Sequence, residues 1–294
     1  NTVKVTSTGM NFDAPDENPA GWTTFRFMNK TPNVHFFVIQ DLPEGKTLED
    51  SKREIVPYFQ AGMDFWRNGD AANAFGTEGF GGLPAWYGEV VMTGGPGLVS
   101  GNLTATSSVY LEPGTYVIEC YVKGRDGNFH SFHGMIDQIV VTGEPEEDAA
   151  PPTADISISI GTAEGIVLEE VPARPGKHTF SVHYADQAVY GNLLGHDVHL
   201  VRIKDSVTEE DLKILNKWMN WFYVGNDMEG FIAPSPEGFI FLGGLQEMPA
   251  GQTGYFSAVL EPGRYALISE IDNPMVIDSE IPNRARMFTE FEIR

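Results

Sequence analysis

The chain is poor in thiols. Its 294 residues include one cysteine, Cys120, and no C-x2-C pattern. A lone cysteine excludes an intramolecular disulfide, and the missing pair excludes the common zinc-finger type of site. In an exported protein, a single thiol is an oxidation hazard unless it is buried or bound to a metal.

Basic residues and long apolar runs are also scarce. Lysine and arginine number 19 against 41 acidic residues, which gives a formal charge of −22. This charge disfavours nucleic acid or an anionic membrane surface as a partner, and it permits a basic protein or redox partner without identifying one. No apolar run approaches the roughly 20 residues that span a bilayer, so we expect no transmembrane segment.

What is present suits two domains. The stretch 142–154, TGEPEEDAAPPTA, is acidic, contains proline and has no apolar side chain larger than alanine, as expected of a linker. A chain of this length is large enough to bury two separate cores. We expect an N-terminal domain over residues 1–143, a linker over 144–153 and a C-terminal domain over 154–294.

The two predicted domains repeat one pattern. Gly94-Gly95 precedes LEPGTY at Leu111–Tyr116, and Gly243-Gly244 precedes LEPGRY at Leu260–Tyr265 after an equal interval. A tandem duplication is the simplest explanation of this self-similarity.

A second correspondence concerns two histidines. Val34-His35-Phe36 aligns with Val198-His199-Leu200, and a helix-like segment follows each run. This alignment makes His199 the expected counterpart of His35.

Short β-rich runs predict most of the secondary structure. Glu112-Pro113-Gly114 is a turn signal between the runs 107–111 and 116–122, and it predicts a hairpin. The apolar run 34–39 predicts a strand buried on both faces. Further strands are expected at Thr2–Thr8, Thr23–Met28 and Ile136–Val141.

Helical spacing appears in two places. Thr47 to Asp50 resembles a capping box, and Pro57 inside the following pattern predicts a kink or two short helices. Thr208–Phe222 predicts a second helical segment. Residues 68–88 are rich in glycine and aromatics, and they form an insertion that either covers a site or packs on the sandwich.

One stretch gathers unusual chemistry. Between 111 and 141 lie Cys120, His130, His133 and Met135. A thiolate, an imidazole and a thioether are soft ligands that suit copper when a further imidazole arrives from elsewhere. His35, the only histidine in its apolar run, is the candidate.

These residues carry a resemblance to a known family. Cys120, His130 and Met135 stand as C-x9-H-x4-M behind the lead-in PGTY at Pro113–Tyr116. The chain thereby resembles the cupredoxins, Greek-key β-sandwiches with a ligand histidine after an early strand and a Cys…His…Met set on the last loop. The resemblance implies an all-β protein of two tandem cupredoxin-like sandwiches with short helical insertions.

The resemblance also implies a ligand set. His35, Cys120 and His130 would form a trigonal plane around copper, with Met135 as a weak axial ligand and His133 as the second choice for His130. The long Cys-to-His interval is similar to that of many bacterial cupredoxin-like proteins of unassigned function.

Two residues depart from the family pattern. Phe36 stands where an asparagine often ties the two ligand loops together. Glu119 precedes Cys120, and a neighbouring carboxylate raises a thiol pKa.

The second copy lacks this ligand set. Ser269 falls where the first copy has Cys120, and Pro282 falls where it has His130. His199 and Met287 remain. Without a thiolate and a second imidazole, we expect the C-terminal copy to be degenerate and to hold no copper.

The resulting functional prediction is an exported copper-binding protein with an electron-transfer or copper-holding role. A periplasmic or extracellular location is expected because cupredoxin-like proteins are usually exported, and a lipid anchor through a removed leader stays open. We expect no enzyme activity, because no general base or His-rich copper triad is evident. The alternative is a metal-free interaction or adhesion module in which Cys120 is structural.

Overall fold

Strands dominate the computed structural model, which describes residues 1–146, 149–188, 194–220, 230–271 and 287–294. The predicted all-β class with short helical insertions is confirmed. The strands of the N-terminal half are β1 (Thr2–Gly9), β2 (Asn11–Asp13), β3 (Glu17–Pro19), β4 (Gly21–Asn29), β5 (Val38–Asp41), β6 (Val91–Met92), β7 (Thr104–Leu111), β8 (Gly114–Glu119) and β9 (Ile136–Thr142). Those of the C-terminal half are β10 (Ile156–Gly161), β11 (Gly165–Leu168), β12 (Gly176–Tyr184), β13 (Val198–Ile203), β14 (Phe239–Leu245), β15 (Thr253–Leu260), β16 (Gly263–Ile268) and β17 (Phe288–Ile293).

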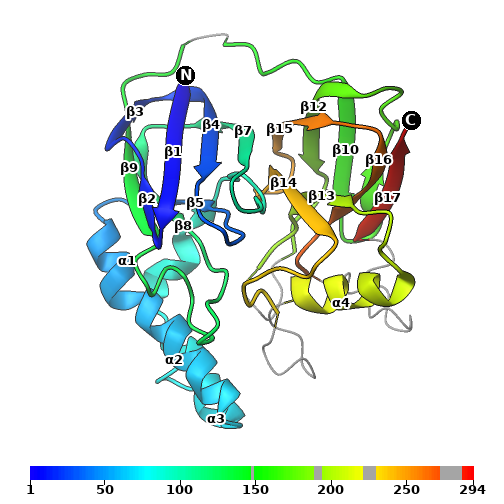
Figure 1. Cartoon of the computed structure of the whole chain (residues 1–294). Coiled ribbons are helices and arrows are strands. Elements are labelled where there is room, and N and C mark those ends of the chain that lie inside the picture. Colours follow the sequence, from blue (N-terminus) through cyan, green and yellow to red (C-terminus); the bar gives the residue numbers. More distant parts are fainter. Residues whose placement is uncertain (147–148, 189–193, 221–229, 272–286) are drawn as a thin grey trace.

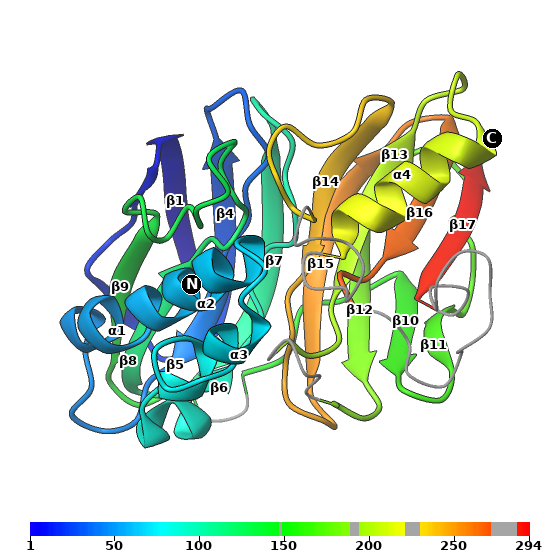
Figure 2. The same cartoon turned by 90° about the horizontal axis from the view of Figure 1, so that it is seen from below.

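One sheet runs through both halves. Its eight strands lie in the order β11-β10-β12-β15-β7-β4-β1-β2, so β15 and β7 join the halves at its centre (Figure 2). Ser107 pairs with Phe256 across this junction. The predicted division into domains at 144–153 stays a prediction.

Each half adds a smaller sheet of its own. The N-terminal half has the order β3-β9-β8-β5-β6 and the C-terminal half the order β14-β13-β16-β17. In β4, buried and less buried residues alternate, with Phe25 and Phe27 in the core and Arg26 outside. This period of two is what a strand with one covered face requires. Each half is therefore a two-layer β-sandwich.

The predicted hairpin at Glu112-Pro113-Gly114 is wrong. β7 pairs with β4 and β15, whereas β8 pairs with β5 and β9. The turn therefore carries the chain from one sheet to the other, which a local turn signal does not distinguish from a hairpin.

The helices lie at one end of the sandwiches (Figure 1). Thr47 and Asp50 form the expected capping box of α1 (Leu48–Glu54), and Pro57 lies in the first turn of α2 (Val56–Arg67). Two short helices thus replace one long one, as Pro57 predicted. The C-terminal half has α4 (Glu209–Met219), capped by Thr208, and Phe222 lies outside the described residues. Among the residues that the structure describes, no helix is long and apolar enough to cross a membrane.

The insertion at 68–88 packs mainly on the helices. It contains α3 (Ala71–Ala74) and the 3₁₀ turns η1 (Phe80–Gly82) and η2 (Ala85–Glu89). Phe80 and Tyr87 each contact Phe59 of α2 edge to face. Trp86 donates a hydrogen bond to Glu54 of α1 at 2.8 Å.

Strand register gives the correspondence between the halves. Val38 pairs with Glu119 on β8, and His199 pairs with Ile268 on β16, one residue before Cys120 and Ser269 respectively. Val38 therefore matches His199, and three residues earlier His35 matches His196. The expected match of His35 with His199 is wrong, because the connection before β13 differs in length from the one before β5.

The junction has an internal two-fold relation. Gly94 N–H donates to the carbonyl of Glu247, and Gly243 N–H donates to the carbonyl of Leu98, both at 2.8 Å. In the repeat register Gly94 matches Gly243, and Leu98 matches Glu247. Reciprocal contacts of this kind are the mark of an isologous interface, here formed within one chain.

Candidate metal centre

The first ligand candidate lies just before a strand. His35 N–H donates to the carbonyl of Val99 at 3.1 Å, and Val99 N–H returns a bond at 2.7 Å. The expected strand at 34–39 forms only from Val38 onward, although Val34 to Val38 are all buried. His35 is thus held in the core by one bridge while the chain is irregular around it.

The other candidates come from the loop between β8 and β9. Cys120 follows β8 directly, and its N–H donates to the carbonyl of Met135 at 3.1 Å. His130 N–H donates to the carbonyl of Val122 at 2.8 Å, and Met135 N–H donates to that of His130 at 2.9 Å. These bonds fold the loop back and bring residues 120, 130 and 135 together.

Three donor atoms converge. The Nδ1 atoms of His35 and His130 lie 3.1 Å apart. Cys120 Sγ lies 3.9 Å from Nδ1 of His35 and 3.6 Å from Nδ1 of His130. With metal–nitrogen bonds of about 2.0 Å and metal–sulfur bonds of about 2.3 Å, a trigonal plane has edges of about 3.5–3.7 Å. The three atoms therefore fit around one ion.

Burial sets the protonation of these groups. His35 and His130 are fully buried, and burial lowers the pKa of His35 to about 4 and that of His130 to about 3. Both rings are therefore neutral near pH 7. Within the described chain, Nε2 of each ring has no hydrogen-bond partner. A neutral ring with its proton on Nε2 offers Nδ1 as a ligand.

The pKa of the Cys120 thiol is shifted in the opposite direction. Burial raises the pKa of Cys120 to about 12, and the charge of Glu119 adds a smaller increase. The direction expected for Glu119 is thus correct, but burial is the larger cause. The backbone N–H groups of Phe36 and Val122 donate to the sulfur and lower its pKa. The site therefore holds a thiol until an ion displaces the proton.

The remaining predicted ligands differ in position. Met135 is fully buried beside this cluster, and its backbone closes the loop. His133 is exposed, and its Nε2 lies 2.9 Å from Asp126 Oδ2. His130, not His133, joins the donor cluster.

Phe36 supplies a link between the ligand loops. Its ring meets that of Tyr121 edge to face at 4.5 Å between centroids. Phe36 follows His35 and Tyr121 follows Cys120, so a ring contact does here what an asparagine does in the family pattern. Phe231 of the C-terminal half packs against both rings.

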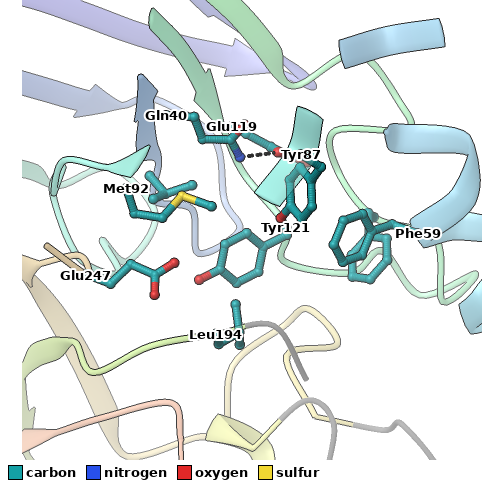
Figure 3. A pocket seen from close by; sticks show the side chains of 10 residues that line it. Gln40, Phe59, Tyr87, Met92, Glu119, Tyr121, Leu194 and Glu247 are labelled. Carbon is teal, nitrogen blue, oxygen red and sulfur yellow. Dashed lines mark hydrogen bonds between the residues drawn. The ribbon is translucent and has the colours of Figure 1, made fainter. Parts of the chain in front are cut away.

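A small cavity lies beside Glu119 and Tyr121, and it also borders Leu194 and Glu247 of the C-terminal half (Figure 3). Its volume is about 30 Å³, which is space for about one water molecule. Gln40 donates to Glu119 at 2.7 Å in its wall, and the side chains of Tyr121 and Glu247 face it. Loss of hydration raises the pKa of Glu119, and that of Glu247 to about 8. No sequence pattern singles out Glu247, because the residues around it meet only in the folded chain.

The C-terminal half has a different arrangement at the matching positions. Ser269 N–H donates to the carbonyl of Met287 at 3.1 Å, as Cys120 does to Met135. His196, the counterpart of His35, has Nε2 at 3.0 Å from Thr162 Oγ1 and 3.4 Å from Asp186 Oδ1. Pro282, the expected counterpart of His130, lies outside the described residues. In the described part of the C-terminal half, Ser269 in place of cysteine leaves these positions without a thiolate.

Comparison with known proteins gives structural matches only. No family model matches the chain, and no curated protein matches it. Among solved structures, the chain is similar to auracyanin A, a "blue" copper protein from Chloroflexus aurantiacus, at 26% identity and a TM-score of 0.30 over 48% of this chain and 98% of that one. It is similar to auracyanin from Roseiflexus castenholzii at 22% identity and a TM-score of 0.29 over 48% of this chain and 97% of that one.

A copper-containing nitrite reductase from Thermus scotoductus matches the whole chain. Its identity is 12% and its TM-score 0.23, over 100% of this chain and 61% of that one. The matches thus include a nitrite reductase as well as auracyanins.

Proposed function

We propose that the protein binds one copper ion through His35, Cys120 and His130, with Met135 as a weak axial ligand, and that it transfers electrons. The convergence of two imidazole Nδ1 atoms and one thiol sulfur carries this proposal. Such a nitrogen and sulfur set suits copper better than magnesium, calcium or manganese.

The environment supports electron transfer by a resident ion. His35, Cys120, His130 and Met135 are all fully buried, so an ion at this site has no direct exit to solvent. Their backbone bonds to Val99, Val122 and one another fix the donor atoms before an ion arrives. Copper supplies a one-electron redox couple. A rigid, buried set of ligands would hold the same coordination geometry in both oxidation states of the ion. Copper holding for later release fits this burial less well.

The optical spectrum after addition of Cu(II) tests the proposal. We expect an intense thiolate-to-copper absorption band in the visible region with one equivalent of copper retained through gel filtration. Cys120→Ala should lack the band, whereas Ser269→Ala, its matched control in the other half, should keep it. Absence of both the band and retained copper would sink the proposal and favour a metal-free interaction module.

A redox titration then separates the two roles. A reversible one-electron potential with the band restored on reoxidation supports electron transfer. Loss of the ion on reduction supports copper holding instead.

A further inference from the structure

A second cluster of ligand-type side chains lies at the junction of the halves. Asp197, His199 and Glu270 each offer one donor atom, and these atoms all lie within 4.8 Å of one another. Asp197 and His199 are fully buried, and Glu270 is 1% exposed. A carboxylate or imidazole in such a place requires a hydrogen bond, an opposite charge or a metal ion.

The strand register shows how unusual this cluster is. Asp197 matches Phe36, His199 matches Val38 and Glu270 matches Tyr121. Three apolar or aromatic positions of one half thus all carry ligand-type residues in the other. Packing alone gives no reason for an imidazole and two carboxylates to replace them at a single spot.

Two of the donors are held by bonds on their other atoms. Asp197 Oδ1 accepts Ser269 Oγ–H at 2.5 Å and the N–H of Glu270 at 2.9 Å. Leu98 N–H donates to Nδ1 of His199 at 3.0 Å. Gly97 makes room for this ring, because a Cβ there would lie 2.8 Å from Nδ1. The bonds to Oδ1 orient the Asp197 carboxylate, and the bond from Leu98 fixes the plane of the His199 ring.

The remaining atoms face each other. Asp197 Oδ2 and His199 Nε2 lie 2.5 Å apart, and neither has a further hydrogen-bond partner in the described part of the chain. Tyr121 O–H, from the other half, donates to Glu270 Oε1. Two buried donor atoms that contact each other and converge with a third, from Glu270, are what a cation site presents.

We propose that Asp197, His199 and Glu270 bind a divalent cation of the zinc class at the junction of the two halves. Two carboxylates and one imidazole form the mixed oxygen and nitrogen set that Zn²⁺ accepts. Bonds of about 2.0 Å place neighbouring ligands about 3.3 Å apart, so the pair of Asp197 and His199 opens slightly when the ion enters. Because Leu98 N–H donates to Nδ1, the His199 ring carries its proton on Nε2. To bind an ion through Nε2, the ring moves this proton to Nδ1 and gives up the bond from Leu98, so that it binds as a neutral imidazole.

Zinc binding by the full chain carrying Cys120→Ser tests this site apart from the copper centre. Isothermal titration with Zn²⁺, and metal analysis after gel filtration, should show one bound equivalent. Adding Glu270→Gln, which keeps an acceptor for Tyr121, or His199→Gln should weaken binding at least about 10-fold. Glu164→Gln, an exposed change in the same half, should leave it unaltered.

Two results overturn the proposal. One is a Cys120→Ser chain that retains no zinc. The other is equal affinity in the Glu270→Gln and Glu164→Gln chains, which places the ion elsewhere and leaves Asp197 and His199 as a structural hydrogen-bonded pair. Thermal unfolding of each variant without metal shows whether the variant is folded. If His199→Gln does not fold, Asp197→Asn, which keeps the Oδ1 bonds, replaces it in the test.

Discussion

The two halves tie the same pair of loops together by different chemistry. In the N-terminal half, Phe36 packs against Tyr121 across the chain from the donor cluster of His35, Cys120 and His130. In the C-terminal half, Asp197 accepts hydrogen bonds from Ser269 and Glu270. In the N-terminal half, aromatic rings thus lie at the junction, and the polar donor cluster lies away from it. In the C-terminal half, carboxylates and an imidazole lie at the junction.

The difference teaches that one fold allows polar groups on either side of the strand that ends at residue 119 or 268. Cys120 joins the donor cluster, whereas the next residue, Tyr121, packs against Phe36. At the matching positions, Ser269 and Glu270 both bond to Asp197.

The largest expected effect separates the two matching histidines. His35→Ala should abolish the visible copper band and weaken Cu(II) binding by about 100-fold or more, because a ligand of the plane is lost. His196→Ala should keep the full band, because its ring contacts Thr162 and Asp186 rather than a thiol. Titration with Cu(II), followed optically, checks both. Loss of the band in the His196 variant would contradict the assignment of the site to the N-terminal half.

The next prediction places the residue type of Asp197 at the matching position of the N-terminal half. Phe36→Asp should lower the free energy of unfolding by about 3–5 kcal/mol, because a buried ring is lost and an unpaired charge is buried in its place. Urea unfolding measures the change. Phe36→Leu is the control, with an expected cost of about 1 kcal/mol or slightly more. If the two variants are equally stable, the junction accepts charge in either half.

A pH effect follows from Glu247 at the junction. Its pKa is raised by burial from 4.5 to about 8. The folded chain therefore keeps a proton that the unfolded chain releases, so stability falls as pH rises from about 5 to about 8, by at most about 1.4 kcal/mol per unit. Above pH 8 this contribution no longer changes.

Glu247→Gln removes that titration while keeping an acceptor for the N–H of Gly195. Urea unfolding at a series of pH values should show a shallower slope between pH 5 and 8 for this variant than for the parent chain. Glu164→Gln, which alters an exposed carboxylate, should keep the parent slope. Parallel slopes in all three chains would show that Glu247 ionises normally.

The smallest effect concerns His133. Its pair with Asp126 is solvent-exposed, so His133→Gln should change the free energy of unfolding by less than about 1 kcal/mol. The copper band should be unchanged, because His130 occupies the donor cluster. A lost or shifted band would instead make His133 a ligand.

The sequence predicts the structure correctly where the signal for it is local. The capping box at Thr47, the break at Pro57 and the spacing of Cys120, His130 and Met135 predicted the helices and the loop that gathers the donors. It does not predict which strands pair when the partners are far apart in the chain. The turn after Leu111 looks the same whether the next strand joins the same sheet or the opposite one.

The junction cluster has no local signal for the same reason. The pair Val-His occurs in both runs and predicts His199 as the counterpart of His35. Only the pairing of β13 with β16 shows that His196 holds that place, which frees His199 to meet Asp197 and Glu270. A repeat aligned by its most regular strand, LEPGTY against LEPGRY, rather than by its histidines, would have been the better guide.

The pairing of β7 with β15 also bears on aggregation. Each strand would be the open edge of its half if the other were removed, and unpaired edges recruit further strands. Ser107 and Phe256 occupy the same place in the repeat, so the edge of either half is shaped to accept a copy of itself. The covalent linkage keeps the complementary edge close at hand, and a single half released by proteolysis would be prone to self-association along this strand.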